Sequence, residues 1–273
     1  MNNENNFFDE IQKKSEFIRR ETLKLHKLAP ETRVASSLSD VEIFAVLYYG
    51  KILKYDPVNI NLIDRDRLIV SKGHGGISLY PILADLGFFD KSHLSKICTN
   101  KSLLGGIPDC IIPGFETVNG SLGHGPGVAS GIALALGRKK IDAQVYVLCG
   151  DGELYEGSVW EAVMFAGHHQ IPNFTMIVDY NKIAMLDYCD KIISHNQLAE
   201  RFKSFKWNVF DIDGHDIESL FYALSECKKN SKPNVVIANT VKGKGVPSLE
   251  KDSLCHIKSL SVSQIDALLA EMI

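Results

Sequence analysis

Two apolar, β-branched runs in this sequence each end in residues that can bind a metal ion and a phosphate. The first, residues 145–150, is followed by Asp151 and Gly152. The second, residues 174–180, is followed by Asn181. A carboxylate and an amide oxygen, completed by backbone carbonyl and phosphate oxygens, suit Mg2+ that holds a diphosphate. Because the 28 residues between Gly152 and Asn181 are enough for one helix and a return strand, Asp151 and Asn181 can meet at the carboxyl edge of a parallel sheet.

The rest of the chain predicts an α/β fold, a parallel sheet flanked by helices on both faces. Strand-like runs alternate with stretches in which apolar residues recur at helical spacing, as in domains built from crossover units. Strands are expected at 64–71, 207–212 and 234–239, and in the apolar parts of the stretches 145–153 and 174–181. Helices are expected at 8–29, 41–49 (capped by Ser39 or Asp40), 80–88, 128–138, 157–168, 217–228 and 262–272 (capped by Ser261 or Ser263).

Small residues recur along the helix expected at 128–138. Gly127, Gly131 and Ala135 lie four residues apart, so they share one helix face. We expect this face to pack closely on the sheet, and the amides at the helix start can meet an anionic oxygen.

Composition narrows the possible partners and compartments. The chain of 273 residues is 45% apolar, and its net charge of −3 without a basic stripe argues against nucleic acid as a partner. Its six cysteines form no Cys-x-x-Cys pair and are typical of reduced thiols in the cytoplasm. The N-terminus lacks the apolar core of a signal peptide, and the uncharged stretch at 117–137 is Gly-, Ser- and Asn-containing in its first half. We therefore expect a soluble, cytoplasmic protein with no membrane partner.

Four short blocks give the sequence a family resemblance. In order, they are Ser-Lys-Gly-His-Gly at 71–75, Gly-Ser-Leu-Gly-His-Gly at 120–125, Asp-Gly-Glu-Leu-Tyr-Glu-Gly at 151–157 and Asp-Gly-His-Asp at 213–216. Together they resemble transketolase, and the resemblance runs from about residue 15 to the end of the chain. Gly-Asp-Gly with an Asn one helix and one strand later is also similar to the thiamine diphosphate signature of that family.

The resemblance implies thiamine diphosphate and Mg2+, or Ca2+ or Mn2+ in its place. It assigns the metal to the side chains of Asp151 and Asn181 and the carbonyl of Ile183. It implies cofactor contacts at His74, Gly120, Ser121, Leu122, His124, Asp151, Gly152, Asn181, Ile183 and His256, and catalytic roles for His74, His256 and Glu156.

Several of these residues also have a purely structural interpretation. A lone histidine is more often structural, but His74 lies between two glycines at the end of a strand, which favours ligand contact. His256 can be a diphosphate and substrate contact or a surface histidine. Glu156 can belong to a network of acids that links two active sites, or it can simply favour a helix dipole. His124 occupies a position that is often Gln in relatives.

The sequence departs from the family at several places, one of them Ile257, which follows His256 where relatives have glycine. Arg33 and Ile107 occupy positions where transketolases usually have sugar-contacting histidines, so we expect a substrate pocket of changed charge and shape. Arg33 can bind a carboxylate or a phosphate, which favours a specialised sugar pathway or a different donor. Tyr188 lies in a turn where glycine is usual, which puts the local loop conformation in doubt.

By resemblance, residues 1–273 form one domain, the diphosphate-binding domain. The chain ends at Ile273, about where the pyrimidine-binding domain of a full-length transketolase would begin. We therefore expect a separate C-terminal transketolase-like subunit to supply that domain and its catalytic glutamate, in an α2β2 heterotetramer. The implied reaction is transfer of a two-carbon ketol unit between sugars or sugar phosphates.

Two other functions are compatible with the same residues. One is a two-chain 2-oxo acid decarboxylase or acyl-transferring enzyme that uses the same cofactor. The other is a non-catalytic, cofactor-binding regulatory subunit, which the altered histidine positions favour and the intact Asp151, Asn181 and His74 oppose.

Overall fold

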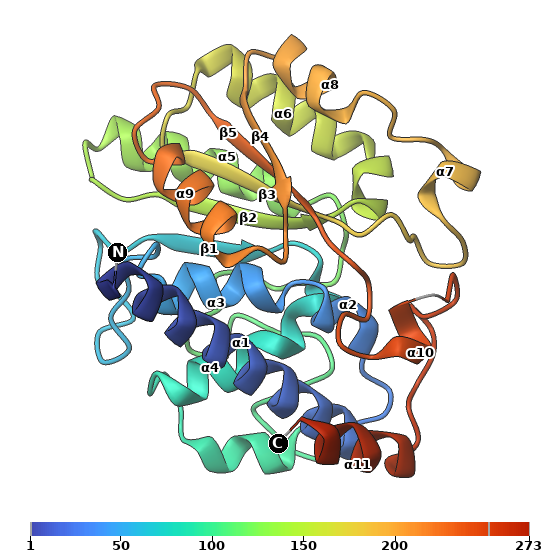
Figure 1. The fold of residues 1–273 in the computed structure, drawn as a ribbon. Helices are drawn as coiled ribbons and strands as arrows, with labels where there is room; N and C mark the ends of the chain where they lie inside the picture. Colours follow the sequence, from blue (N-terminus) through green and yellow to red (C-terminus); the bar gives the residue numbers. More distant parts are fainter. Residues whose placement is uncertain (1, 251, 273) are drawn as a thin grey trace.

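A five-stranded sheet, parallel throughout, forms the centre of the computed structural model, which describes residues 2–250 and 252–272 (Figure 1). Its strand order is β1-β2-β3-β5-β4. The strands are β1 (Arg67–Val70), β2 (Val145–Gly150), β3 (Phe174–Tyr180), β4 (Asn208–Asp213) and β5 (Asn234–Asn239). The predicted fold class is confirmed, and β2 and β3, which precede Asp151 and Asn181, are neighbours.

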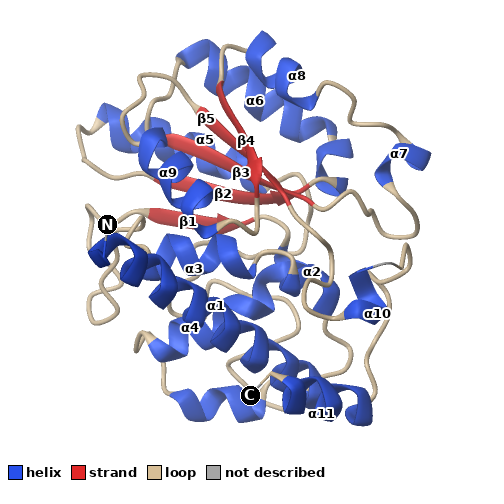
Figure 2. Ribbon diagram, viewed as in Figure 1, coloured by secondary structure: helices blue, strands red, loops and turns tan. Residues whose placement is uncertain are grey.

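Helices surround the sheet, as Figure 2 shows. The α-helices are α1 (Asn2–Leu28), α2 (Val34–Leu38), α3 (Val41–Tyr49), α4 (Leu79–Asp85), α5 (Gly125–Arg138), α6 (Gly157–His169), α7 (Cys189–Ile192), α8 (Leu198–Ser204), α9 (Ile217–Cys227), α10 (Pro247–Glu250) and α11 (Val262–Glu271). Three 3-10 helices are η1 (Gly73–Ser78), η2 (Lys91–Lys96) and η3 (Gly152–Tyr155). The short helices α2, α7, α8 and α10 and the 3-10 helices have no strong sequence pattern and are not among the predicted elements.

Alternate residues of each strand enter two different apolar clusters, one on each face of the sheet. Tyr146 and Leu148 of β2 pack in the cluster that contains residues of α3 and α9. Val145 and Val147 pack in the cluster that contains residues of α5 and α6. Since side chains alternate across a strand, both faces are covered, and ligand access is left to the strand ends.

The residues expected to cap helices divide into two outcomes. Ser261 caps α11 through the backbone N–H of Gln264, whose side chain accepts a hydrogen bond from the Ser261 backbone in return. Asp40 lies at the N-cap position of α3 but makes no cap hydrogen bond there. Its carboxylate is completely buried and accepts a hydrogen bond from Ser78 instead, so the expectation that Asp40 caps this helix is wrong.

The expected small-residue face of α5 does not contact the sheet. Gly127, Gly131 and Ala135 are exposed, whereas Ala129 and Ala133 are buried against the strands. The helix offers small residues on more than one side, and the side with Cβ atoms buries more apolar surface than a side with glycines. The expected close packing through Gly127, Gly131 and Ala135 is therefore wrong.

None of the described helices has the length and apolar character needed to cross a membrane. All six cysteines are unpaired, and four of them are buried. The reduced state expected from their spacing agrees with this arrangement.

Two glycines of neighbouring helices give a matched stability prediction. A Cβ at Gly167 of α6 would lie 1.9 Å from the carbonyl oxygen of Phe205, whereas a Cβ at Gly131 of α5 would meet nothing within 4 Å. We expect Gly167→Ala to lower the free energy of unfolding by about 1–3 kcal/mol through overpacking. Gly131→Ala should raise it by up to about 1 kcal/mol, because alanine is the better helix former. Urea unfolding of both variants tests the pair, and equal effects would contradict it.

Candidate active site

A cavity of about 500 Å3 opens at the carboxyl ends of β1, β2 and β3. Eight of the predicted site residues line it: His74, Gly120, Leu122, Asp151, Gly152, Asn181, Ile183 and His256. They come from five separate segments of the chain, so the fold brings together most of the predicted site. A second cavity of about 180 Å3, beside Phe88 and Phe115, contains none of these residues.

Asp151 is the buried acid of this cavity. Its Oδ1 accepts a hydrogen bond from the backbone N–H of Gly152 at 2.8 Å, and its Oδ2 accepts one from the backbone N–H of Lys182. Burial raises the pKa of Asp151 to about 6, and the charge of Asp179 acts in the same direction. Because a buried carboxylate is costly without a cation, the site favours binding of a positive charge beside Asp151.

The amide of Asn181 is oriented by its own neighbours. Its Nδ2 donates to Asp179 Oδ2 at 3.0 Å, and its Oδ1 accepts from the backbone N–H of Ile183 at 3.2 Å. The amide oxygen therefore lies on the side of the chain turn that leads to the Ile183 carbonyl. In this turn the left-handed backbone conformation falls on Lys182, with φ 67°. Tyr188 has φ −63° and pairs with Ile183 in a β-bridge, so a side chain at position 188 causes no backbone strain.

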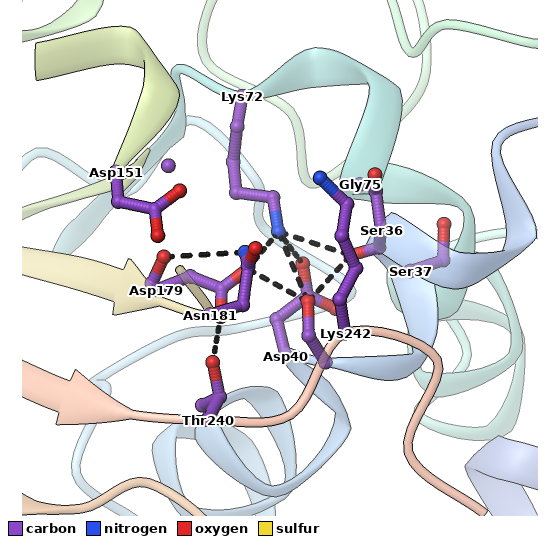
Figure 3. Close-up of polar contacts among 12 residues, drawn as sticks. Ser36, Ser37, Asp40, Lys72, Gly75, Asp151, Asp179, Asn181, Thr240 and Lys242 are labelled. Atoms are coloured by element: carbon purple, nitrogen blue, oxygen red, sulfur yellow. Dashed lines mark hydrogen bonds and ion pairs between the residues drawn. The ribbon is translucent and has the colours of Figure 1, made fainter. Parts of the chain in front are cut away.

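Lys72 forms the centre of a buried ion network under the cavity (Figure 3). Its ammonium pairs with Asp179 and lies 3.1 Å from Asp40 Oδ2, and all three side chains have at most 1% of their surface exposed. It also donates to the carbonyl oxygen of Ser36 at 2.9 Å. Burial raises the pKa of Asp40 to about 7 although Lys72 opposes this change. Burial acts to raise the pKa of Asp179, but the ion pair with Lys72 and the hydrogen bonds from Lys72, Thr240 and Ser39 together lower it.

Lys242 brings a second buried cation into the cavity. Its Nζ donates to the carbonyl oxygen of Ile183 at 2.6 Å. Burial lowers the pKa of Lys242, an effect that the nearby Asp151 opposes. The ammonium of Lys242 thus contacts the same carbonyl oxygen, that of Ile183, which the resemblance assigns to a metal ion. This contact shows that the carbonyl oxygen can bind a positive charge.

The two histidines of the cavity lie together and are neutral at neutral pH. The ring centroids of His74 and His256 are 5.0 Å apart, and His256 Nδ1 is 3.3 Å from Ser36 Oγ. Burial lowers the pKa of His74 well below its usual value, and burial with the charge of Lys242 lowers the pKa of His256 to about 3. Neutral imidazoles can accept or donate a proton, so both rings are suited to proton transfer or to holding a hydroxyl.

Three predicted site residues lie outside the main cavity. Ser121 and His124 line a separate hollow of about 150 Å3 beside it. Glu156 is exposed at the start of α6 and makes no cap hydrogen bond. The buried glutamate of this motif is Glu153, which accepts a hydrogen bond from the backbone N–H of Gly123 at 2.8 Å.

The two positions that depart from the family differ in their relation to the cavity. Arg33 lines it, and its charge contributes to the lowered pKa of His256. Ile107 is 49% exposed and is not among the residues that line the cavity. A Cβ added to Gly120 would lie 3.6 Å from the Ile107 side chain. Ile107 therefore packs beside the turn at Gly120.

Sequence reasoning missed both lysines. Lys72 and Lys242 lie within the Ser-Lys-Gly-His and Val-Lys-Gly-Lys-Gly segments, but a lysine between small residues is usually exposed. Their glycine neighbours were a possible signal. A Cβ at Gly75 would lie 2.5 Å from the Lys72 side chain, so the glycine is needed to bury the amine.

The donor atoms fit the implied ligands. A carboxylate, an amide oxygen and a backbone carbonyl belong to the oxygen set that Mg2+ and Ca2+ prefer. Lys242, Lys72 and Arg33 supply positive charge around the same cavity, which suits an anionic diphosphate. Among the described residues no group of three or more His, Cys, Asp or Glu side chains forms a metal site, so a metal here needs backbone and ligand oxygens.

Comparisons with known proteins agree on one family. The model of the transketolase thiamine diphosphate-binding domain matches residues 32–272. The chain is 36% identical to one of the subunits of the apulose-4-phosphate transketolase of Actinobacillus succinogenes, over 100% of this chain and 99% of that protein. It is 34% identical to the 6-deoxy-6-sulfo-D-fructose transketolase subunit SqwG of a Clostridium species, over 96% of both chains.

A solved structure shows the same relation in three dimensions. The transketolase of Campylobacter jejuni superposes with a TM-score of 0.90 at 31% identity, over 96% of this chain and 43% of that one. The chain thus spans less than half of that transketolase but nearly all of the two subunits.

The buried ion network gives a prediction for Lys72. Replacing Lys72 with methionine leaves Asp40 and Asp179 buried without their cation, and we expect a loss of about 3–5 kcal/mol in the free energy of unfolding. Lys203→Met removes an exposed ion pair with Glu200 and should cost no more than about 0.5 kcal/mol. Chemical denaturation of both variants is the measurement, and a Lys72→Met variant as stable as Lys203→Met would contradict the network's role.

The lowered pKa of His256 gives a prediction on acid stability. The pKa of His256 is about 3 in the folded chain and near 6.5 in the unfolded chain. The neutral ring therefore contributes stability at pH values above about 6.5, and this contribution is lost as the pH falls toward 3. Relative to His256→Asn, the natural chain should lose about 2–3 kcal/mol between pH 6.5 and pH 4. Urea unfolding of both chains along this pH range checks the expectation, and parallel curves would overturn it.

Proposed function

The chain belongs to the transketolase family, and we propose that it is the cofactor-binding subunit of a two-chain transketolase. In this proposal it binds thiamine diphosphate and Mg2+, or Ca2+ or Mn2+ in its place, and a two-carbon ketol unit passes between sugars or sugar phosphates. The observation that carries the proposal is the convergence of Asp151, Asn181 and the Ile183 carbonyl on one cavity that also holds Lys242.

Each part of the cavity has a task in this reaction. When bound, thiamine diphosphate supplies the chemistry that breaks and forms carbon–carbon bonds next to a carbonyl. Asp151, Asn181 and the Ile183 carbonyl would hold the metal, and Lys242 would neutralise charge on the diphosphate. His74 and His256, both neutral, would hold substrate oxygens and move protons. Gly120 and Gly152 would let the backbone approach the cofactor closely, and Leu122 would support its aminopyrimidine.

Ser121, His124 and Glu156 lie outside the main cavity in this chain alone. Ser121 and His124 face a neighbouring hollow, and Glu156 is exposed. We propose that a partner chain covers this surface, so that Glu156 reaches its role in a network of acids only in the assembly.

The relatives support a separate partner chain. Two relatives of matching length carry the word subunit in their names, whereas the Campylobacter jejuni transketolase contains more than twice the matched length in one chain. The segment after β3 also carries exposed apolar side chains. Met185, Leu186 and Ile192 line the cavity, and Tyr188 and Ile193 lie close to them in the sequence. Such a group on a protein surface marks an interaction site. We propose that the C-terminal transketolase-like subunit, with the pyrimidine-binding domain and the catalytic glutamate, docks there in an α2β2 assembly in the cytoplasm.

Arg33 supports an anionic sugar as substrate. It is exposed at the cavity wall near His256, and a guanidinium binds phosphate, carboxylate or sulfonate groups through paired N–H donors. The names of the two subunit relatives both contain an anionic sugar, a sugar phosphate in one and a sulfosugar in the other.

Isolation of the tagged chain from its own cells tests the function. We expect a second chain to co-purify at equal stoichiometry, and the mixture, but neither chain alone, to transfer a ketol unit in the presence of thiamine diphosphate and Mg2+. Turnover by the chain alone would refute the two-chain proposal. Release of CO2 from a 2-oxo acid would select a decarboxylase instead, and cofactor binding without turnover in the mixture would favour a regulatory subunit.

Asp151→Ala gives a direct test of the metal assignment. The variant lacks the buried carboxylate, so we expect Mg2+ to cause no increase in its thiamine diphosphate affinity, as measured by titration calorimetry. Asp187→Ala, which changes a partly exposed carboxylate of the following loop, serves as the control and should behave like the natural chain. Unchanged Mg2+ dependence in Asp151→Ala would refute the assignment.

Arg33→His tests the choice of substrate. In the assembled enzyme we expect this variant to lose at least tenfold in kcat/KM for anionic sugars, and to lose less for neutral ketoses. Arg138→His, at the end of α5, is the control for a lost surface arginine. An unchanged preference between anionic and neutral donors would count against a role for Arg33.

A further inference from the structure

The Asp213-Gly214-His215 motif lies outside the cavity but is held by short hydrogen bonds and close packing. Asp213 Oδ1 accepts from the backbone N–H of His215 at 2.8 Å, and Gly214 N–H donates to the Asn239 carbonyl at 2.8 Å. A Cβ at Gly214 would lie 2.5 Å from the Thr240 side chain. The glycine therefore lets the end of β4 lie against the end of β5, and this contact places the imidazole beside the segment that follows β5.

The imidazole of His215 joins that segment to α3. Its Nε2 accepts from the backbone N–H of Val241 at 2.8 Å, and its Nδ1 is 2.9 Å from Glu42 Oε2. Since a backbone N–H can only donate, Nε2 is the acceptor, and the proton is on Nδ1, which donates to Glu42. Both side chains are largely buried, with 12% and 5% of their surface exposed.

Arg19 of α1 extends this chain of contacts to the far side of the same segment. It pairs with Glu42 Oε1, and its NH1 donates to the Lys244 carbonyl at 2.6 Å and to the Leu38 carbonyl at 3.1 Å. The three side chains thus bind the backbone at two points, Val241 N–H and Lys244 C=O. These two points flank Lys242.

The segment needs such support. Gly243 and Gly245 have φ values of 78° and 85°, and glycine is free to leave such conformations. Placing the Lys242 amine on the Ile183 carbonyl also costs side-chain entropy, and burial opposes its charge. An unsupported backbone would let this ammonium move away from the cavity.

We propose that His215 is a positioning residue: with Glu42 and Arg19, it fixes the backbone on both sides of Lys242 and so holds the Lys242 ammonium inside the cavity. The Asp-Gly-His motif then acts on the site without touching it. The consequence for cofactor affinity rests on the proposed function, whereas the position of the ammonium in the ligand-free chain does not.

Labelling of lysines in the ligand-free chain tests the position directly. In the natural chain Lys242 and Lys72 should both react slowly with an amine-acetylating reagent, as mapped by mass spectrometry, because both are buried and hydrogen-bonded. In His215→Leu, the rate at Lys242 should rise at least fivefold while Lys72, which is held by other residues, stays slow. Equal rates at Lys242 in both chains, or an equal rise at Lys72, would overturn the proposal.

A milder variant covers the case in which His215→Leu does not fold. His215→Gln keeps an acceptor for Val241 N–H but loses the imidazole contact to Glu42, so we expect an intermediate rise at Lys242. Glu42→Gln removes the charge that holds Arg19 and should also raise the rate. No rise at Lys242 in either folded variant would contradict the proposed coupling.

A double-mutant cycle tests the effect on the cofactor, in the full chain alone and in the assembled complex. We expect His215→Leu and Lys242→Met each to weaken thiamine diphosphate affinity at least fivefold, and the double variant to be no weaker than Lys242→Met alone. Lys244→Met is the control, because Arg19 contacts the backbone carbonyl of Lys244 and not its side chain. Combined with Lys244→Met, His215→Leu should retain its full effect on the affinity. Additive losses with Lys242→Met would refute action through Lys242. A natural chain that does not bind the cofactor would refute the proposed function. The labelling result would still decide whether His215 holds the Lys242 ammonium in the cavity.

Discussion

The ammonium of Lys72 is the charge around which the site is arranged. It is buried where it borders the cavity. An unpaired buried charge costs several kcal/mol, so Asp179 and Asp40 must stay beside it. Asp179 is then a fixed acceptor, and it orients both the amide of Asn181 and the hydroxyl of Thr240. One buried pair therefore connects the start of the turn that holds Asn181 with the segment that carries Lys242.

Buried polar groups need hydrogen-bond partners, and this need also explains how segments outside the sheet are held at the cavity. Ser36, in the short helix α2, accepts a hydrogen bond from Lys72 at its carbonyl oxygen, and its hydroxyl lies 3.3 Å from His256 Nδ1. Lys242 gives its hydrogen bonds to the carbonyl of Ile183. Since water cannot replace these partners in the interior, five segments that are distant in sequence share one cavity wall. Rigidity of this kind suits a site that must hold a large cofactor in one orientation.

Much of this arrangement could be predicted from local patterns. Asp151 and Asn181 follow apolar strands, so their meeting at one sheet edge follows from parallel topology. Helix α3 and strand β5 have the bounds that the sequence predicts, because each is a strong periodic or apolar run. The six unpaired thiols also follow from their spacing.

Contacts between residues that are distant in the sequence could not be predicted. The partners of Lys72 come from residues 40 and 179, and no local pattern states which carboxylate a lysine will meet. In α5 two faces were small enough to pack, and only the total apolar area decided that Ala129 and Ala133 face the sheet. Asp40 has the residue type of a helix cap, but the buried ammonium competes for it more strongly than the helix end does.

The strand order also has a consequence for how the protein forms during synthesis. Strand β4 pairs with β5 alone, and β5 follows it in the sequence. While the ribosome extends the chain, residues 208–213 have no neighbour in the sheet until residues 234–239 have emerged and paired with β3. The sheet therefore grows from its β1 edge through β2 and β3, and its last two strands, β5 and β4, join out of sequence order. A chain released before β5 would leave β4 without a partner and one edge of the apolar strand β3 unpaired. Such an edge promotes aggregation rather than a smaller folded domain.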